Sequence, residues 1–91
     1  MFRLVITNKF KKDVSLIRKR GYDTELLKRV ILQLEKTGKL PKTKKPHRLS
    51  GIYSDYWEAH IKPDWLIIWK VIKNENEIWL VRTGTHSDLF K

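Results

Sequence analysis

Three histidines and two carboxylates in the second half of the chain are side chains that could move protons. His47, His60 and His86 each fall near the end of a predicted strand, and Glu58 and Asp64 flank His60. Imidazole has an unperturbed pKa of about 6.5, so it gives and takes protons near neutral pH. Two such groups can cleave RNA: a base takes the ribose 2′-OH proton, this oxygen attacks the adjacent phosphorus, and an acid protonates the departing 5′-oxygen. The alternative is that each histidine only hydrogen-bonds a loop or a strand end.

This chemistry also needs a cation beside the phosphorus, and the sequence offers Arg82 and a basic segment. Residues 1–51 carry a net charge of +11 and residues 52–91 a net charge of −1, so nearly all of the total of +10 lies in the first half. The densest run contains no acid and comprises Lys36, Lys39, Lys42, Lys44, Lys45 and Arg48. Such a run predicts phosphate binding that weakens steeply with salt. A solvated loop that keeps the protein soluble is the alternative.

A metal site built from the same side chains is a weaker interpretation. His60 and Asp64, with His47 and His86, have the right ligand types, but their spacing matches no compact metal-binding motif. The excess of positive charge also disfavours a divalent cation. The chain has no cysteine and only four glycines, which argues against thiol catalysis and a glycine-rich nucleotide cradle. We therefore expect neither a metal nor a cofactor.

Hydrophobic periodicity predicts a strand and two helices in the first half of the chain. The β-branched run at 2–6 is typical of a strand, and apolar residues at positions 10, 14 and 17 have the spacing of an amphipathic helix. A second helix is expected to begin after Asp23 as its N-cap and to end at Gly38. Residues 39–46 contain two prolines and four lysines, and are expected to form a basic loop.

The second half of the chain changes to a period of two, which predicts antiparallel strands at 56–61, 65–69 and 78–82. Residues 65–69 are apolar throughout, as in a central strand covered on both faces, and Trp57 is expected to face the helices. We therefore predict one domain over residues 1–91. It is a two-layer α+β fold: an N-terminal strand, a helical hairpin on one face, then an antiparallel β-meander. Glu58 and His60 would share the open face, about 6.5–7 Å apart at Cα.

Three blocks of sequence resemble a known family. They are HRLSG at 47–51, EAHIKPDW at 58–65 and RTGTHSDLF at 82–90, and they resemble the YafQ branch of the RelE toxin superfamily over the whole chain. The resemblance implies a RelE-like fold and a ribosome-dependent endoribonuclease. Such a toxin cleaves mRNA in the decoding site and is held inactive by a cognate antitoxin. The resemblance places catalytic groups at His47, His60, Asp64, His86 and the terminal aromatic Phe90.

The chain departs from the family at Trp57-Glu58-Ala59-His60, where relatives often have Arg-Glu/Asp-x-His. One basic residue is therefore absent from that strand, and stabilisation of the phosphate falls on other cations. We expect substrate contacts from Glu58, Arg82, Lys42, Lys44, Lys45 and Arg48.

Two other functional classes share these features. A ParE-like toxin would bind DNA gyrase without cleaving nucleic acid, and a plain RNA-binding module would need only the positive charge. The histidines together with Asp64 favour the enzyme, because neither alternative needs them.

No apolar run approaches the ~18 residues that cross a bilayer, and no signal peptide is expected. We expect a cytoplasmic protein with no membrane partner, monomeric when free and hetero-oligomeric with an acidic antitoxin.

Overall fold

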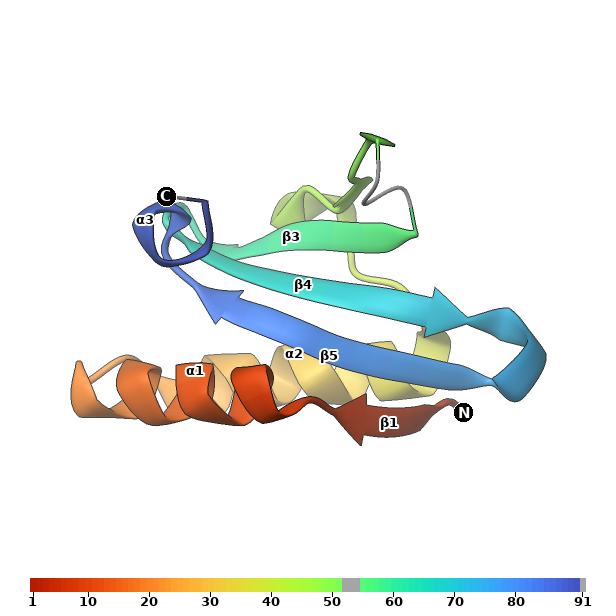
Figure 1. The fold of residues 1–91 in the computed structure, drawn as a ribbon, viewed down its shortest axis with the longest axis horizontal. Coiled ribbons are helices and arrows are strands. Elements are labelled where there is room, and N and C mark those ends of the chain that lie inside the picture. The colour runs from red at the N-terminus through yellow and green to blue at the C-terminus, as the bar shows by residue number, and fades with distance from the viewer. Residues whose placement is uncertain (52–54, 91) are drawn as a thin grey trace.

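The computed structural model describes residues 1–51 and 55–90, and in these residues five strands form one sheet with two helices on one face (Figure 1). The elements are β1 (Arg3–Ile6), α1 (Asn8–Lys19), α2 (Thr24–Thr37), β2 (His47–Arg48), β3 (Tyr56–Lys62), β4 (Trp65–Ile72), β5 (Glu77–Gly84) and α3 (His86–Leu89). The order of strands in the sheet is β1-β5-β4-β3-β2. The predicted two-layer α+β architecture is confirmed.

α2 begins and ends at the predicted signals, and α1 has an N-cap that the sequence analysis did not predict. The Thr7 side chain accepts the N–H of Phe10 at 3.1 Å and caps α1, and the Asp23 side chain caps α2. Gly38 ends α2 with a φ of 73°, in the left-handed region that glycine adopts without strain. A Cβ at this position would lie 2.6 Å from the ring of Phe2, so close packing also requires glycine here.

The meander of β3, β4 and β5 is antiparallel, and β4 lies at its centre as predicted. All five residues from Trp65 to Trp69 are buried. Trp65, Ile67 and Trp69 belong to the core cluster that includes the helices, so the alternation places Leu66 and Ile68 on the opposite face. Trp57 stacks on Trp69, with 6.2 Å between ring centroids, which confirms that it packs on the helical side.

β1 occupies an edge of the sheet that sequence periodicity does not specify. It pairs in parallel with β5, with Leu4 opposite Ile78. Beyond the end of β1, side chains rather than a strand satisfy the backbone of β5. The Thr7 hydroxyl donates to the Leu80 carbonyl at 3.0 Å, and Asp13 on α1 accepts the N–H of Thr83 at 3.1 Å. α1 therefore closes the remainder of this edge.

The basic segment that follows α2 has more order than a plain loop. Lys42–Lys44 form a short 3-10 turn, and β2 (His47–Arg48) begins three residues after it ends. β2 pairs antiparallel with β3, which places His47 opposite Glu58 and Arg48 opposite Trp57. Within residues 1–51 and 55–90, no helix is both long and apolar enough to span a bilayer.

Candidate active site

Three sequence-predicted residues meet at one end of the sheet. His60 lies near the end of β3, Asp64 lies in the turn between β3 and β4, and His86 begins α3 directly after β5. The register explains why they meet: His60 is opposite Leu66 on β4, and Leu66 is opposite Gly84, two residues before His86. Three adjacent strands thus bring together residues that are up to 26 positions apart in the chain.

Asp64 holds His86 through two hydrogen bonds to the same carboxylate oxygen. The His86 Nδ1 lies 2.6 Å from Asp64 Oδ1, and the His86 backbone N–H donates to that oxygen at 3.0 Å. The backbone bond and then the imidazole bond lower the pKa of the Asp64 carboxyl. Because an ionised carboxylate only accepts hydrogen bonds, the proton of the neutral ring lies on Nδ1. His86 Nε2 is then left to accept a proton from a substrate or, once protonated, to return it.

His60 and Phe90 lie on either side of the same imidazole. The ring centroids of His60 and His86 are 5.9 Å apart, and those of His86 and Phe90 are 6.5 Å apart. The Nδ1 of His60 lies 3.2 Å from the carbonyl oxygen of Pro63, which only accepts, so His60 also has its Nε2 free. Phe90 is exposed. Two imidazoles, a carboxylate and an aromatic ring therefore form one cluster at this end of the sheet.

His47 forms a separate pair with Glu58. The His47 Nε2 lies 3.3 Å from Glu58 Oε1, and its Nδ1 lies 3.2 Å from the carbonyl oxygen of Lys45. Both partners are acceptors when Glu58 is ionised, so both bonds together require the doubly protonated ring. The Glu58 side chain is buried, and its residue lies two positions from His60 along β3. The structure thus places Glu58 as a partner of His47, beside the cluster of His60, Asp64 and His86.

Arg82 is held by an acid that the sequence analysis did not identify. Its Nε donates to Asp13 Oδ2 at 2.7 Å and its Nη2 donates to Asp13 Oδ1 at 3.1 Å. These bonds raise the pKa of Arg82, which keeps its charge at any physiological pH. Of its donors, the Nη1 group is left for an additional partner. The remaining predicted cations lie beside β3: Lys42, Lys44, Lys45 and Arg48, with the Arg48 guanidinium 5.8 Å from the Trp57 ring centroid.

The short helix that carries His86 is fixed by contacts that the sequence analysis also missed. Thr85 and Asp88 form a capping box, in which each side chain accepts the backbone N–H of the other residue. The guanidinium of Arg20 donates to both carboxylate oxygens of Asp88, at 2.7 and 3.0 Å. A Cβ on Gly84 would lie 2.9 Å from Asp88 Oδ2, so this turn needs glycine. The Thr-x-x-Asp spacing is a helix-start signal that was visible in the sequence.

The pair of Arg20 and Asp88 predicts an acid-dependent loss of stability. First the Arg20 guanidinium and then the Thr85 N–H hold the pKa of Asp88 well below its ordinary value of 3.8. The unfolded chain therefore binds more protons than the folded chain below about pH 4. We expect Asp88→Asn to lower the unfolding midpoint in urea at pH 7, and the difference from the parent to shrink as the pH falls from 5 to 3. Arg20→Ala should reproduce this loss, and an undiminished difference at pH 3 would contradict the assignment.

A metal centre does not fit the described side chains. In residues 1–51 and 55–90, His, Asp and Glu form no group of three or more that could hold a metal ion. The Asp64 oxygen that faces His86 is already used in two hydrogen bonds.

Comparison with known proteins places this chain in a defined family. Residues 2–91 match the family model described as the bacterial toxin of the type II toxin–antitoxin system, YafQ. The mRNA interferase toxin YafQ of Escherichia coli K12 is 38% identical over 85 residues, which cover 92% of this chain and 90% of that protein. The structure of the E. coli DinJ-YafQ complex contains a chain with 35% identity and a TM-score of 0.88, with full coverage of both chains. A metal-bound toxin from Helicobacter pylori has 39% identity and a TM-score of 0.90, covering 99% of this chain and 100% of its own.

Proposed function

Because the chain belongs to the YafQ family of bacterial toxins from type II toxin–antitoxin systems, we propose that it is an endoribonuclease that cleaves mRNA on the ribosome. One observation carries the proposal: the Nδ1 of His86 is held by Asp64 while its ring lies 5.9 Å from that of His60. Acid–base cleavage of RNA requires one group that accepts a proton and one that donates a proton. The two imidazoles can fill these roles, because each has a free Nε2 atom beside the aromatic ring.

The two histidines divide the proton transfers of the reaction. One imidazole, acting as base, takes the proton from the ribose 2′-OH, and the 2′-oxygen attacks the adjacent phosphorus. The bond from phosphorus to the 5′-oxygen breaks, and the other imidazole, acting as acid, protonates this oxygen. The products are a 2′,3′-cyclic phosphate and a free 5′-OH, so one proton enters the enzyme and one leaves. Asp64 holds the His86 ring by its Nδ1 throughout the reaction, so that Nε2 faces the substrate.

Other residues bind and orient the RNA in this proposal. The Phe90 ring offers a base a stacking surface beside His86. The free Nη1 group of Arg82 can offset negative charge on the phosphate. Glu58 acts indirectly, because its oxygen holds His47. No metal takes part in this mechanism, since the proton transfers and the charge stabilisation are assigned to side chains.

Primer extension on mRNA, with and without ribosomes, tests the proposed function. We expect discrete cleavage sites within the reading frame when ribosomes translate the message, and little cleavage of the same RNA when it is free. Equal cleavage of free RNA would contradict the dependence on ribosomes. Inhibition of DNA supercoiling by gyrase, without any RNA cleavage, would instead indicate the ParE-like alternative.

The basic segment should determine how ribosome binding depends on salt. The triple substitution of Lys42, Lys44 and Lys45 by glutamine removes three candidate phosphate contacts. We expect the slope of log affinity against log salt to fall by roughly two to three. Binding to ribosomes measured between 50 and 200 mM salt checks this prediction. Lys9, Lys12 and Lys19 on α1, replaced together by glutamine, are the matched control, and an equal change in their slope would contradict a local role.

We also propose that an acidic antitoxin binds this chain. The net charge of +10 favours an acidic partner through complementary charge. In the E. coli relative, YafQ is found in a complex with DinJ. We expect the free toxin to be a monomer and the inhibited form to be a hetero-oligomer, which light scattering on the two purified forms would distinguish.

A further inference from the structure

Three side chains form a row across the open face of the sheet, at the end away from His86. Trp79 on β5 is opposite Lys70 on β4, and Lys70 is opposite Tyr56 on β3. A sequence neighbour of each of the three packs on the helical side, so the alternation of the strands turns these side chains to the open face. Tyr56, Lys70 and Trp79 are called the cross-strand row below.

Trp79 is exposed, yet its indole is anchored at its polar edge. It is 40% exposed, whereas Trp65 and Trp69 are at most 2% exposed. The Trp79 Nε1 donates to Glu77 Oε1 at 3.1 Å, and the Arg3 guanidinium donates to the other oxygen of this carboxylate. Glu77 is itself buried. A buried, paired acid therefore orients a ring that does not belong to the core.

A cation lies beside the second ring of the row. The Lys70 Nζ is 5.4 Å from the centroid of the Tyr56 ring, which is within the range of a cation–π contact. Both side chains are half-buried. The row thus places one positive charge between two aromatic rings. Proteins bind single-stranded nucleic acids with this combination, because bases stack on the rings and cations contact the phosphates.

The cross-strand row shares its face with the candidate active site. Tyr56, Glu58 and His60 alternate along β3 and point to the same side. Tyr56 and His60 are four positions apart, or about 13 Å of strand. At about 3.4 Å per stacked nucleotide this distance equals about four nucleotides, and fewer where the RNA is extended. In Figure 1, α3 lies at one end of the sheet and the turn between β4 and β5 at the other, so the face runs between them.

We propose that the cross-strand row binds a base of the mRNA, about two to four nucleotides from the bond that is cleaved. The base stacks on the Trp79 ring, and Lys70 contacts a neighbouring phosphate. The position relative to the cleaved bond rests on the proposed function, whereas the binding of single-stranded RNA rests on the row itself. Phe90 holds one nucleotide beside the histidines and Trp79 holds another, so the strand is fixed at two points of the sheet.

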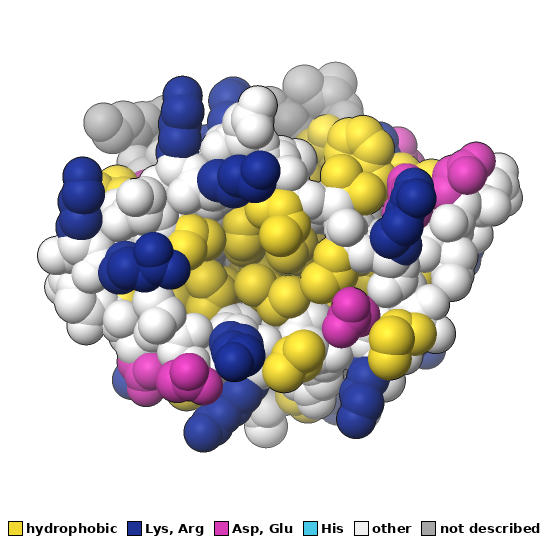
Figure 2. Space-filling model, turned by 90° about the horizontal axis from the view of Figure 1, so that it is seen from below, with side chains coloured by type: hydrophobic (Ala, Val, Ile, Leu, Met, Phe, Trp, Pro, Cys, Tyr) yellow, Lys and Arg dark blue, Asp and Glu magenta, His cyan; other side chains and the backbone are white. Residues whose placement is uncertain are grey.

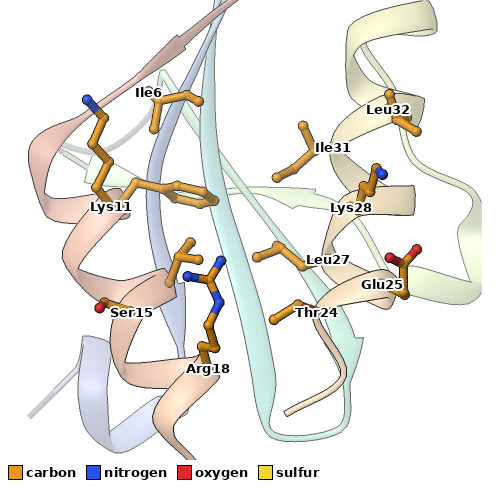
Figure 3. Close-up of a pocket in the computed structure, with 12 residues that line it drawn as sticks. Ile6, Lys11, Ser15, Arg18, Thr24, Glu25, Leu27, Lys28, Ile31 and Leu32 are labelled. Atoms are coloured by element: carbon orange, nitrogen blue, oxygen red, sulfur yellow. The ribbon is translucent and has the colours of Figure 1, made fainter. Parts of the chain in front are cut away.

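The helical side of the molecule offers a base no comparable surface. Figure 2 shows an apolar hollow there, surrounded mainly by Lys and Arg. Leu27 and Ile31 of α2 point into this hollow (Figure 3). The described apolar residues that line it are aliphatic except for Phe10, which is 2% exposed. A base on that side would meet positive charge but no exposed ring.

Two other occupants of the row are less well supported. A second copy of this chain would bring its own net charge of +10 against Lys70 and Arg3. Ribosomal RNA has the same chemistry as mRNA. The row continues the face that carries His60, however, and this continuity favours the RNA that is cleaved there.

Abasic sites placed in turn along the mRNA test the proposed position. Ribosomes carry a short synthetic mRNA in which one 2′-deoxy nucleotide prevents cleavage, and the binding of labelled toxin is measured by fluorescence anisotropy. We expect loss of the base about two to four nucleotides from the blocked bond to weaken binding of the parent about fivefold or more. The Trp79→Ala chain should bind this abasic mRNA and the intact mRNA equally. An abasic profile that is the same in both chains would overturn the proposal.

Substitutions at Trp79 distinguish stacking from a structural role. Phenylalanine keeps an aromatic ring and should retain most of the binding, whereas leucine keeps apolar bulk without a ring and should lose as much as alanine. Leu16→Ala is the matched control, because Leu16 is 42% exposed on α1 in the other layer, and it should bind as the parent does. Parental binding by Trp79→Leu would overturn the proposal. So would a loss in Trp79→Ala that is equal on every mRNA, which would assign the row to ribosomal RNA.

The phosphate contact of Lys70 has its own readout. Lys70→Gln should lower the slope of log affinity against log salt by about 0.7, the value for one contact with a single strand. Lys12→Gln on α1 is the matched control and should leave the slope unchanged. Equal slopes in the two variants would contradict the contact.

Free RNA separates the row from the proposed function. Trp79 is the most exposed of the four tryptophans, so a base that stacks on it should quench indole fluorescence when a short single-stranded RNA is added. Trp79→Phe should remove this quenching, and quenching that persists in it would overturn the proposal. Quenching by Trp79 without any mRNA cleavage would support the row and reject the proposed function. Cleavage with neither quenching nor a position-dependent abasic effect would overturn the row alone.

Discussion

Replacement of His86 by alanine should lower the rate of mRNA cleavage by roughly 10²- to 10⁴-fold, the usual contribution of a general acid or base. His86 has the requirements for this role: its Nδ1 is held by Asp64, and its ring is exposed beside His60 and Phe90. No neighbouring group in the cluster can replace both its proton and its position. Single-turnover cleavage on translating ribosomes would measure the loss. Growth arrest on expression without antitoxin should disappear in parallel.

Ser87→Ala is the matched control for this experiment. Ser87 follows His86 in α3, is exposed, and makes no hydrogen bond described for its side chain. This variant should cleave at the parent rate. Both variants should have the circular dichroism spectrum and thermal midpoint of the parent, because neither side chain supports the core. Near-parental cleavage by the His86→Ala chain would reject the assignment of His86 to proton transfer.

Replacement of Asp64 by asparagine should lower the cleavage rate constant by about 10- to 100-fold with little change in KM. A hydrogen bond to a charged group contributes about 1.5–3 kcal/mol, and each 1.36 kcal/mol of transition-state stabilisation is a factor of ten in rate. The amide keeps an oxygen that can accept the His86 N–H, but it has no charge to favour the imidazolium. Because the pKa of Asp64 is lowered in the parent, the carboxylate is ionised throughout the neutral range and the loss should be full at pH 7.

The division between kcat and KM distinguishes positioning from binding in the Asp64 variant. An effect on KM alone would mean that Asp64 contacts the RNA rather than acting through His86. Asp64→Glu should recover part of the rate, since it restores the charge with a longer side chain. Asp55→Asn is the matched control, because Asp55 is an exposed carboxylate just before β3 and is not part of the cluster. Equal losses in the two asparagine variants would contradict the pairing of Asp64 with His86.

Local patterns predicted the faces of the sheet and the ends of the helices. The period of two placed Trp57 on the helical side and Glu58 and His60 on the other, because alternation follows from the geometry of a single strand. The N-cap at Asp23 and the left-handed residue at Gly38 are also local, since each depends on the few residues around it. These features needed no knowledge of which elements are neighbours in space.

The contacts that the sequence did not reveal join residues far apart in the chain. Asp13 and Arg82 are 69 positions apart, and Arg20 and Asp88 are 68 positions apart. No periodicity relates such residues, and they meet because α1 lies along β5. β2 was missed because two residues are too few to show alternation. The functional motifs could identify His60, Asp64 and His86, whereas the residues that hold them in place required the fold.

The parallel pairing of β1 with β5 has a consequence for the synthesis of the protein. β1 is translated first among the described strands, yet it and α1 dock on β5, the last of those strands to leave the ribosome. Until then the nascent chain has neither the edge contacts of Asp13 nor the turn that carries His86. A translation product interrupted before residue 77 therefore lacks His86 and β5, the strand on which β1 and α1 dock. Under the proposed function, we expect such a fragment to leave mRNA intact.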